Sequence, residues 1–228
     1  MRLIYVRHGH PNYEKDCLTE LGHKHAAAAA QRLKNEGIQK IFSSSCGRAY
    51  ETAGYTARVL GLDVQAYDYM REIGWGTLEG EALYHDGHPW DNADKMVLEN
   101  IPLCDDRLFE KEPFCRNDVK NYVALMARES DQWLESLGYR REGNYYRCIG
   151  QPYDTVAAFG HGGASAALFS RLFNLPFLFL CHSMGLDYTG IVVIDFPHKP
   201  GELVSPRFEV FNDARHIQHL KIQNVFNR

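Results

Sequence analysis

Short apolar runs alternate with longer segments of helical character along the first part of the chain. Residues 3–6 and 38–42 are β-branched or aromatic runs of strand length, and such runs predict buried strands. Helical segments follow at residues 20–37 and 47–60, the second closed by Gly61, a residue favoured where helices end. This strand–helix–strand–helix order favours parallel strands joined by right-handed crossovers. The pattern therefore predicts an α/β fold with a mostly parallel central sheet.

The second half of the chain continues this pattern. Further strands are predicted at residues 62–67, 155–159, 190–196 and 207–211, and further helices at residues 117–137 and 164–173. Residues 139–149 predict a hairpin that turns at Glu142-Gly143-Asn144,. The hairpin carries Arg140, Arg141 and Arg147, which either contact an anionic substrate or form a solvated face.

Two segments interrupt the alternation. Residues 70–80 contain three glycines and Trp75, which predicts a structured loop. Its carboxyl groups are Glu72 and Glu79; one held beside Trp75 could be desolvated enough to act as an acid, or both are ordinary loop carboxylates. In residues 82–120 acidic side chains outnumber basic ones. We expect an insertion of short helices and loops there, either a lid over a site or a surface elaboration.

Composition restricts the classes of ligand and compartment. The 228 residues suit one domain spanning 1–228,. The formal net charge is -4 and the sequence has no block of basic residues, so it does not predict binding to nucleic acid or to a membrane surface,. No apolar segment reaches the ~18 residues that span a bilayer. Six cysteines lack C-x-x-C spacing, so we expect reduced thiols in a cytoplasmic protein. His85 and His88 invite a metal, but no second ligand pair follows them,.

Three predicted strand ends carry side chains that could take part in binding or catalysis. Arg7 and His8 follow the first strand, Arg48 begins the helix after the second, and His161 with Gly162 follows the strand at 155–159. Each alone is compatible with a solvated surface group. Because the carboxyl ends of parallel strands meet at one edge, we expect them to lie together where ligands bind.

Two arginines and two histidines at one sheet edge suit a single phosphoryl group, whose charge spreads over its oxygens during transfer. A neutral histidine can attack phosphorus and hold it as phosphohistidine. Positive charge nearby should lower the pKa of that histidine and keep its lone pair available. Glu72 is the candidate proton donor to the leaving group. This chemistry requires neither a metal nor an organic cofactor.

Sequence motifs resemble a known family over essentially the whole chain. They are Arg7-His8-Gly9 for R-H-G, Leu18-Thr19-Glu20-Leu21-Gly22 for L-T-x-x-G, residues 43–53 for S-x-x-x-x-R-A-x-x-T-A, residues 72–80 for E-x-x-F-G-x-W-E-G with altered aromatic positions, Gly160-His161-Gly162-Gly163 for S-H-G-G, and Asn212-Asp213 with His216 for a common ending. In this order they resemble the histidine phosphatase superfamily, in its phosphoglycerate mutase-like branch.

The resemblance implies a fold and a set of roles. The fold is a three-layer α/β/α sandwich with the site at the carboxyl edge of the sheet. The nucleophile is His8, Glu72 is the proton donor, and Arg7, Arg48 and His161 bind the phosphoryl group. The glycines after His161, Gly162 first, let the backbone approach the substrate.

Departures from the family pattern bear on the substrate. His10 stands where the family usually has Glu or Gln, and Glu14 where an asparagine often assists phosphate binding. Mutases of the family carry H-G-N-S-L-R, whereas this chain has His161-Gly162-Gly163-Ala164-Ser165-Ala166 and lacks the arginine.

We therefore expect hydrolysis of a small phosphorylated metabolite, with a cofactor-dependent mutase and a non-catalytic phosphate-binding regulatory module as alternatives. The sequence leaves the natural substrate open, and a homodimer is compatible with it.

Overall fold

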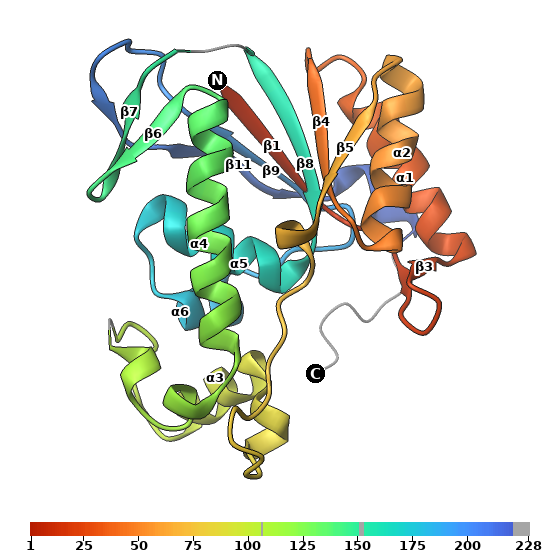
Figure 1. The fold of residues 1–228 in the computed structure, drawn as a ribbon. Helices are drawn as coiled ribbons and strands as arrows, with labels where there is room; N and C mark the ends of the chain where they lie inside the picture. The colour runs from red at the N-terminus through yellow and green to blue at the C-terminus, as the bar shows by residue number, and fades with distance from the viewer. Residues whose placement is uncertain (106, 151–152, 221–228) are drawn as a thin grey trace.

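A six-stranded sheet in the order β11-β9-β1-β8-β4-β5 runs through the molecule (Figure 1). The computed structural model describes residues 1–105, 107–150 and 153–220. The strands are β1 (Arg2–Arg7), β4 (Lys40–Ser44), β5 (Val64–Tyr67), β8 (Thr155–Gly160), β9 (Ile191–Asp195) and β11 (Arg207–Asp213). The pairs β1–β8, β4–β8 and β4–β5 are parallel, and only β9 runs against its neighbours β1 and β11 in this sheet. The predicted mostly parallel sheet is confirmed.

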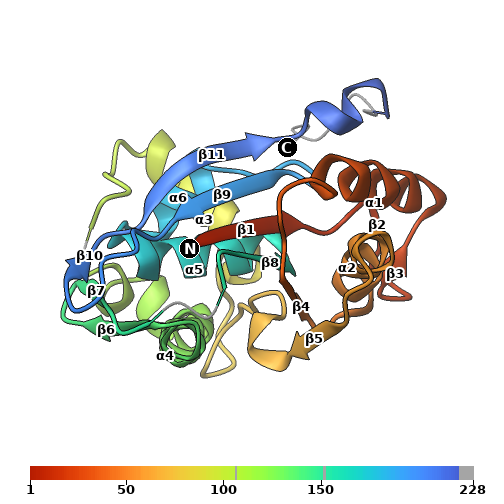
Figure 2. The same ribbon diagram turned by 90° about the horizontal axis from the view of Figure 1, so that it is seen from above.

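Helices cover both faces of the sheet, which makes three layers (Figure 2). The helices are α1 (Glu20–Leu33), α2 (Gly47–Leu60), α3 (Pro89–Leu98), α4 (Val119–Ser136), α5 (Gly162–Phe173) and α6 (Phe177–Ser183). Alternate residues of a strand point to opposite faces. Ile4 of β1 accordingly packs in one cluster with Leu33 of α1 and Ala53 of α2, whereas Tyr5 packs in another with Leu134 of α4 and Phe169 of α5. The three-layer sandwich is confirmed.

Local signals account for the helix boundaries next to the site. Thr19 caps α1, because its side-chain oxygen accepts a hydrogen bond from the backbone N–H of Gly22 at 3.1 Å,. α2 ends at Gly61, which has φ +67°, a conformation that glycine adopts without a Cβ clash. α1 ends at Leu33 rather than at the predicted Gly37, since the chain turns over residues 34–36.

The predicted hairpin forms but lies away from the carboxyl ends of the strands (Figure 1). It consists of β6 (Tyr139–Glu142) and β7 (Tyr145–Cys148), and β10 (Leu203–Val204) adds a third strand. Arg140 pairs with Glu135, and Arg147 pairs with Glu142. The interpretation of this hairpin as a substrate contact has no support in its position.

The insertion at 82–120 consists of short helices and loops, as expected. Besides α3 it contains η2 (Tyr84–Gly87), η3 (Leu108–Glu110) and η4 (Phe114–Arg116). Buried Asn117 joins it to the loop at 70–80, because its side chain donates to the Gly87 carbonyl at 2.7 Å and accepts from the Gly76 N–H at 3.3 Å. The two irregular segments are therefore held together beyond the carboxyl ends of the strands.

Two short strands, β2 (Pro11–Asn12) and β3 (Cys17–Leu18), pair in the loop that follows β1. Within the described ranges, no helix combines the length and apolar character needed to cross a membrane.

Candidate active site

The strand-end residues meet as the parallel topology predicts. The backbone N–H of His8 donates to the carbonyl of Gly160 at the end of β8, at 2.9 Å. The ring centroids of His8 and His161 are 5.1 Å apart. Arg48 is the second residue of α2, directly after β4, and its Nε lies 3.4 Å from Nε2 of His8.

His8 is buried and held in one tautomer. Its side chain is 1% exposed, and Nδ1 lies 2.7 Å from the carbonyl oxygen of Gly9. A carbonyl only accepts, so Nδ1 carries the proton and the neutral ring keeps its lone pair on Nε2. Burial, followed by the charge of Arg7, lowers the pKa of His8 to about 3. The sequence predicted that nearby positive charge lowers this pKa, and burial contributes more to the shift than the charge of Arg7.

Asp16 in the turn between β2 and β3 holds Arg48. One carboxylate oxygen of Asp16 accepts from Nη1 of Arg48, and the other accepts from the backbone N–H of Gly47 at 2.8 Å. Arg48 is only 9% exposed, so the interpretation of a solvated first-turn arginine is wrong. Asp16 had no sequence signal, because it lies in a turn and its contact with the start of α2 joins residues that are distant in the chain.

Arg7 is held by residues that follow α6. Its Nη1 donates to the Leu186 carbonyl, and its guanidinium carbon lies 4.5 Å from the ring centroid of Tyr188. Its Nε is buried and has no hydrogen-bond partner among the described residues. Arg7 therefore keeps donor capacity that nothing in the described chain uses.

His161 caps the start of α5 with its ring fully buried. Nε2 lies 2.8 Å from the hydroxyl oxygen of Ser44, and within the described part of the chain Nδ1 has no partner. Burial, then the charge of His8, lowers the pKa of His161 well below its ordinary value. Gly162 is the first residue of α5, and N–H groups in a first helical turn lack intrahelical partners.

Glu72 is fixed against the N-terminus of α5. Oε1 accepts from the backbone N–H groups of Ala164 at 2.8 Å and Ile73 at 3.0 Å, and Oε2 lies 3.4 Å from that of Gly163. Burial raises the pKa of Glu72, although these hydrogen bonds oppose the shift. The sequence left open whether Trp75 desolvates this carboxyl, and Trp75 is 39% exposed and packs on His88.

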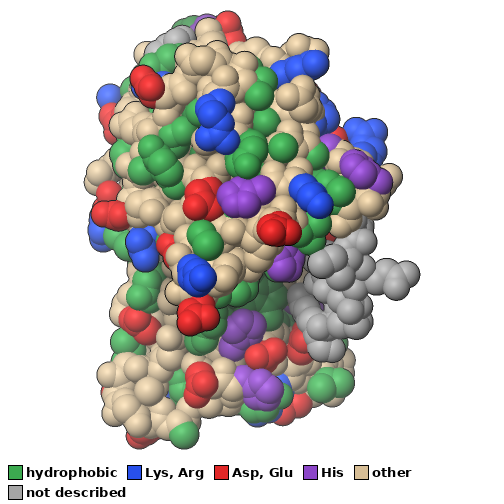
Figure 3. Space-filling model, turned by 90° about the vertical axis from the view of Figure 1, so that its right-hand side faces the viewer, with side chains coloured by type: hydrophobic (Ala, Val, Ile, Leu, Met, Phe, Trp, Pro, Cys, Tyr) green, Lys and Arg blue, Asp and Glu red, His purple; other side chains and the backbone are tan. Residues whose placement is uncertain are grey.

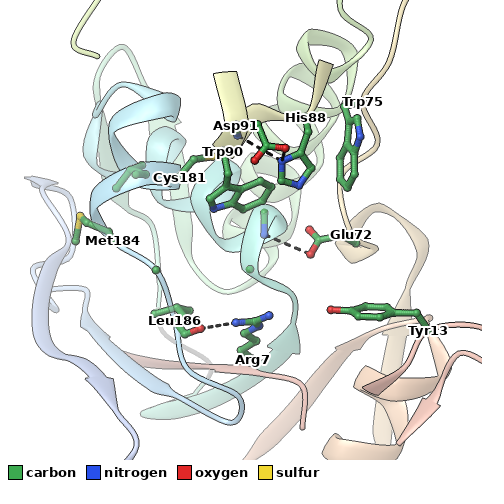
Figure 4. A pocket seen from close by; sticks show the side chains of 14 residues that line it. Arg7, Tyr13, Glu72, Trp75, His88, Trp90, Asp91, Cys181, Met184 and Leu186 are labelled. Carbon is green, nitrogen blue, oxygen red and sulfur yellow. Dashed lines mark hydrogen bonds and ion pairs between the residues drawn. The ribbon is translucent and has the colours of Figure 1, made fainter. Parts of the chain in front are cut away.

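A cavity of about 340 Å³ opens between Arg7, Glu72 and the insertion, and its lining does not include His8, Arg48 or His161 (Figure 4). On this face the space-filling view shows a hollow with histidines around it (Figure 3). The lining residues are Arg7, Tyr13, Glu72, Trp75, His88, Trp90, Asp91, Gly162, Gly163, Leu180, Cys181, Met184, Gly185 and Leu186. Part of the insertion therefore lies on the cavity.

Several other candidates lie elsewhere. Glu79 and Glu14 are exposed and do not line the cavity. His10 Nδ1 lies 2.9 Å from the Thr19 hydroxyl oxygen. Both His85 and His88 lie near Asp91, and the described chain contains no group of three or more potential ligands placed to hold a metal ion.

Comparison with known families finds a match to part of the chain. Residues 3–96 match the model of the histidine phosphatase superfamily (branch 1). This stretch is less than half of the chain, and over it the chain is similar to this superfamily. Among curated relatives, proteins of Yersinia pestis and Yersinia pseudotuberculosis named "Probable phosphoglycerate mutase GpmB" are 29% identical over 160 residues. These residues make up 70% of this chain and 64% of the relatives, so the match spans less than two thirds of their length.

Solved structures extend the superfamily fold over most of the chain. "Mycobacterial hydrolase 2" is 26% identical, with a TM-score of 0.65 over 92% of this chain and 90% of that one. A mycobacterial glucosyl-3-phosphoglycerate phosphatase with inorganic phosphate is 25% identical, with a TM-score of 0.65 over 94% and 98%. A phosphoserine phosphatase of Entamoeba histolytica, 23% identical with a TM-score of 0.63 over 95% and 98%, shows the fold.

Proposed function

We propose that this protein is a phosphomonoester hydrolase that transfers the phosphoryl group of a small phosphorylated metabolite to His8 and then to water. The main support for the proposal is the protonation state of the His8 ring. Its ring is buried and neutral, and the Gly9 carbonyl fixes the proton on Nδ1 and leaves the lone pair on Nε2. A neutral imidazole nitrogen is a competent nucleophile towards phosphorus.

In this proposal Arg7, Arg48, His161 and Gly162 bind the phosphoryl oxygens. The unused Nε of Arg7 and the unpartnered Nδ1 of His161, within the described part of the chain, support it. The Ser44 hydroxyl already accepts from the Cys46 N–H at 3.1 Å, so donating its own proton to Nε2 of His161 satisfies it fully. Nδ1 would then carry a proton that can be donated to a phosphoryl oxygen.

The reaction consists of two displacements at phosphorus. His8 Nε2 forms a bond to phosphorus while the ester P–O bond breaks, and the leaving alcohol oxygen takes the proton of Glu72. The Glu72 carboxylate then accepts a proton from a water molecule, whose oxygen attacks phosphorus and breaks the P–N bond. Phosphate leaves, and His8 and Glu72 return to their starting protonation. The raised pKa of Glu72 suits it for both roles.

Hydrolysis of 4-nitrophenyl phosphate tests this proposal. We expect turnover that a chelator does not reduce, because the scheme uses no metal or organic cofactor. His8→Ala should lower kcat/KM by several orders of magnitude. The matched control is His23→Ala, which removes an exposed histidine of α1 and should leave kcat/KM unchanged. Equal rates in wild type and His8→Ala, or loss of activity on chelation, would contradict the proposal.

The curated relatives' name favours a mutase as a second candidate. Two observations count against it: residues 161–166 contain no arginine, and in the part of the chain that the structure describes, Arg7 is the only Arg or Lys that lines the cavity. Incubation of 3-phosphoglycerate with a bisphosphoglycerate primer separates the two. Formation of 2-phosphoglycerate without release of phosphate would replace the hydrolase proposal.

A phosphate-binding regulatory module would instead bind phosphate and turn over none of the phosphomonoesters. We also assign the protein to the cytoplasm, a proposal that its six free cysteines support,.

A further inference from the structure

Three aromatic rings form a continuous wall of the cavity across from Arg7 (Figure 4). The ring centroids of Trp75 and His88 are 4.7 Å apart at 87°, and those of His88 and Trp90 are 5.1 Å apart. Trp75 belongs to the loop after β5, whereas His88 and Trp90 lie at the start of α3. We call these three residues the aromatic wall.

Asp91 gives this side of the cavity its charge. Its Oδ2 lies 3.0 Å from Nδ1 of His88 and 3.2 Å from Nδ1 of His85, and its side chain is 39% exposed. Among the described residues that line the cavity, Arg7 is the only Arg or Lys, and the proposed mechanism uses it at the phosphoryl group. The side of the cavity away from the phosphoryl group therefore carries the Asp91 carboxylate, and none of the described residues that line this side is an arginine or a lysine.

A carboxylate beside indole faces attracts organic cations, since the ring faces and the carboxylate both act on positive charge. A second anionic group on the substrate would face Asp91 with no arginine or lysine on that side among the described lining residues, and like-charge contacts in a partly desolvated site are unfavourable,. At about 340 Å³ the cavity falls at the lower end of the range for small-ligand sites,.

We infer that the substrate is the phosphomonoester of an alcohol that carries an amine or ammonium group, which binds between Asp91 and the aromatic wall. The inference rests on the proposed function for the position of the phosphoryl group. It separates this chain from enzymes whose phosphorylated substrates carry a second anionic group and no cation.

Binding of three inert analogues tests the inference without requiring turnover. They are benzylphosphonates with a para aminomethyl, methyl or carboxymethyl group, and their Kd values are measured by calorimetry on the full chain at pH 8. We expect the aminomethyl compound to bind at least about tenfold more tightly than the carboxymethyl compound, a ratio equivalent to about 1.4 kcal/mol.

In Asp91→Asn that ratio should fall to about twofold or less, while the Kd of the methyl compound stays unchanged. The matched control is Glu99→Gln, which removes one negative charge just after α3, outside the cavity lining, and should keep the wild-type ratio. Equal binding of the charged compounds to wild type, a reversed order, or the same ratio in Asp91→Asn would overturn the inference.

Hydrolysis of the corresponding aryl phosphates separates this inference from the proposed function. His8-dependent hydrolysis with no charge preference in Kd would overturn the inference and leave the hydrolase standing. The expected charge preference in Kd without hydrolysis of any ester would overturn the hydrolase and support the binding site.

Discussion

Burial sets His8 and Glu72 to the protonation states that the proposed reaction needs. It lowers the pKa of the imidazole to about 3 and raises that of the carboxyl, because each group loses more solvation when charged. Near neutral pH the nucleophile is therefore neutral, and the carboxyl titrates closer to the working pH than a solvated one. One physical cause acts on a base and an acid in opposite directions.

The depressed pKa of His8 predicts a pH dependence of stability. Below about pH 6.5 the unfolded chain protonates this imidazole, whereas the native chain does so only near pH 3,. The free energy of unfolding should therefore fall as pH drops from 6.5 towards 3, and the His8 share of that loss is about 2 kcal/mol at pH 5. In urea unfolding, His8→Asn should lose about 2 kcal/mol less than wild type between pH 7 and pH 5.

Other groups are common to both proteins in that comparison. The pKa values of His161 and His216 are lowered too, and the raised pKa of Glu72 acts with the opposite sign. Because burial is the main cause of the lowered pKa of His161 and His8 contributes less, the difference between wild type and variant reports mainly on His8. Parallel pH profiles for the two proteins would show that His8 does not enter the native state uncharged.

The site residues next to strand ends could be predicted from the sequence. The residues that hold these side chains in position could not. Arg7, His8 and His161 follow predicted strands, so the sheet brings them together. Asp16 and Tyr188 lie in loops and hold Arg48 of α2 and Arg7 of β1 through contacts that are distant in the sequence. Such contacts follow no periodicity, and a lone aspartate or tyrosine in a loop resembles any other.

At the scale of elements, the start of α5 fixes the position of Glu72. A Cβ added at Gly163 would lie 2.6 Å from Cγ1 of Ile73 and 2.8 Å from Oε1 of Glu72. Real Cβ contacts are not that short, so one of these neighbours must move. The absence of a side chain at Gly163 therefore leaves room for Glu72, the proposed proton donor.

Gly163→Ala should therefore displace Glu72. We expect destabilisation by about 1–3 kcal/mol and a loss of turnover on the order of 10²-fold, since misplacement by about 1 Å is that costly. The matched control is Gly54→Ala within α2, where the nearest atom to a new Cβ is Arg58 Nη1 at 3.5 Å. That variant should be more stable by about 0.5–1 kcal/mol with unchanged turnover.

Thermal unfolding and 4-nitrophenyl phosphate turnover measure both variants. Unchanged turnover in Gly163→Ala would contradict the assigned contact between α5 and Glu72.

The bounds of a helix could be predicted where a residue in the sequence marks its end. α2 spans Gly47–Leu60 as predicted, because Gly61 supplies an αL stop. α6, Phe177–Ser183, was not predicted, since seven largely apolar residues after Pro176 show no amphipathic period. The strands β2, β3 and β10 have two residues each, too few for any alternation.

For the whole molecule, the sandwich and the insertion supply different parts of the site. The sandwich contributes Arg7, His8, Arg48 and His161 from its sheet edge, and the insertion contributes the far wall of the cavity. The sequence left open whether residues 82–120 form a lid or a surface elaboration, because the hydrogen bonds of Asn117 that attach them are long-range.

The central claim is that His8 carries the phosphoryl group between substrate and water, and trapping that intermediate tests it most directly. In Glu72→Gln no carboxylate activates water, while 4-nitrophenol, a good leaving group, needs little protonation, so the intermediate should accumulate. The enzyme is mixed with 4-nitrophenyl phosphate, quenched in base and digested for mass spectrometry. We predict one base-stable, acid-labile phosphoryl group on the His8 peptide, in Glu72→Gln and more weakly in wild type. Turnover without any label on His8, or a label on another residue, would contradict the account.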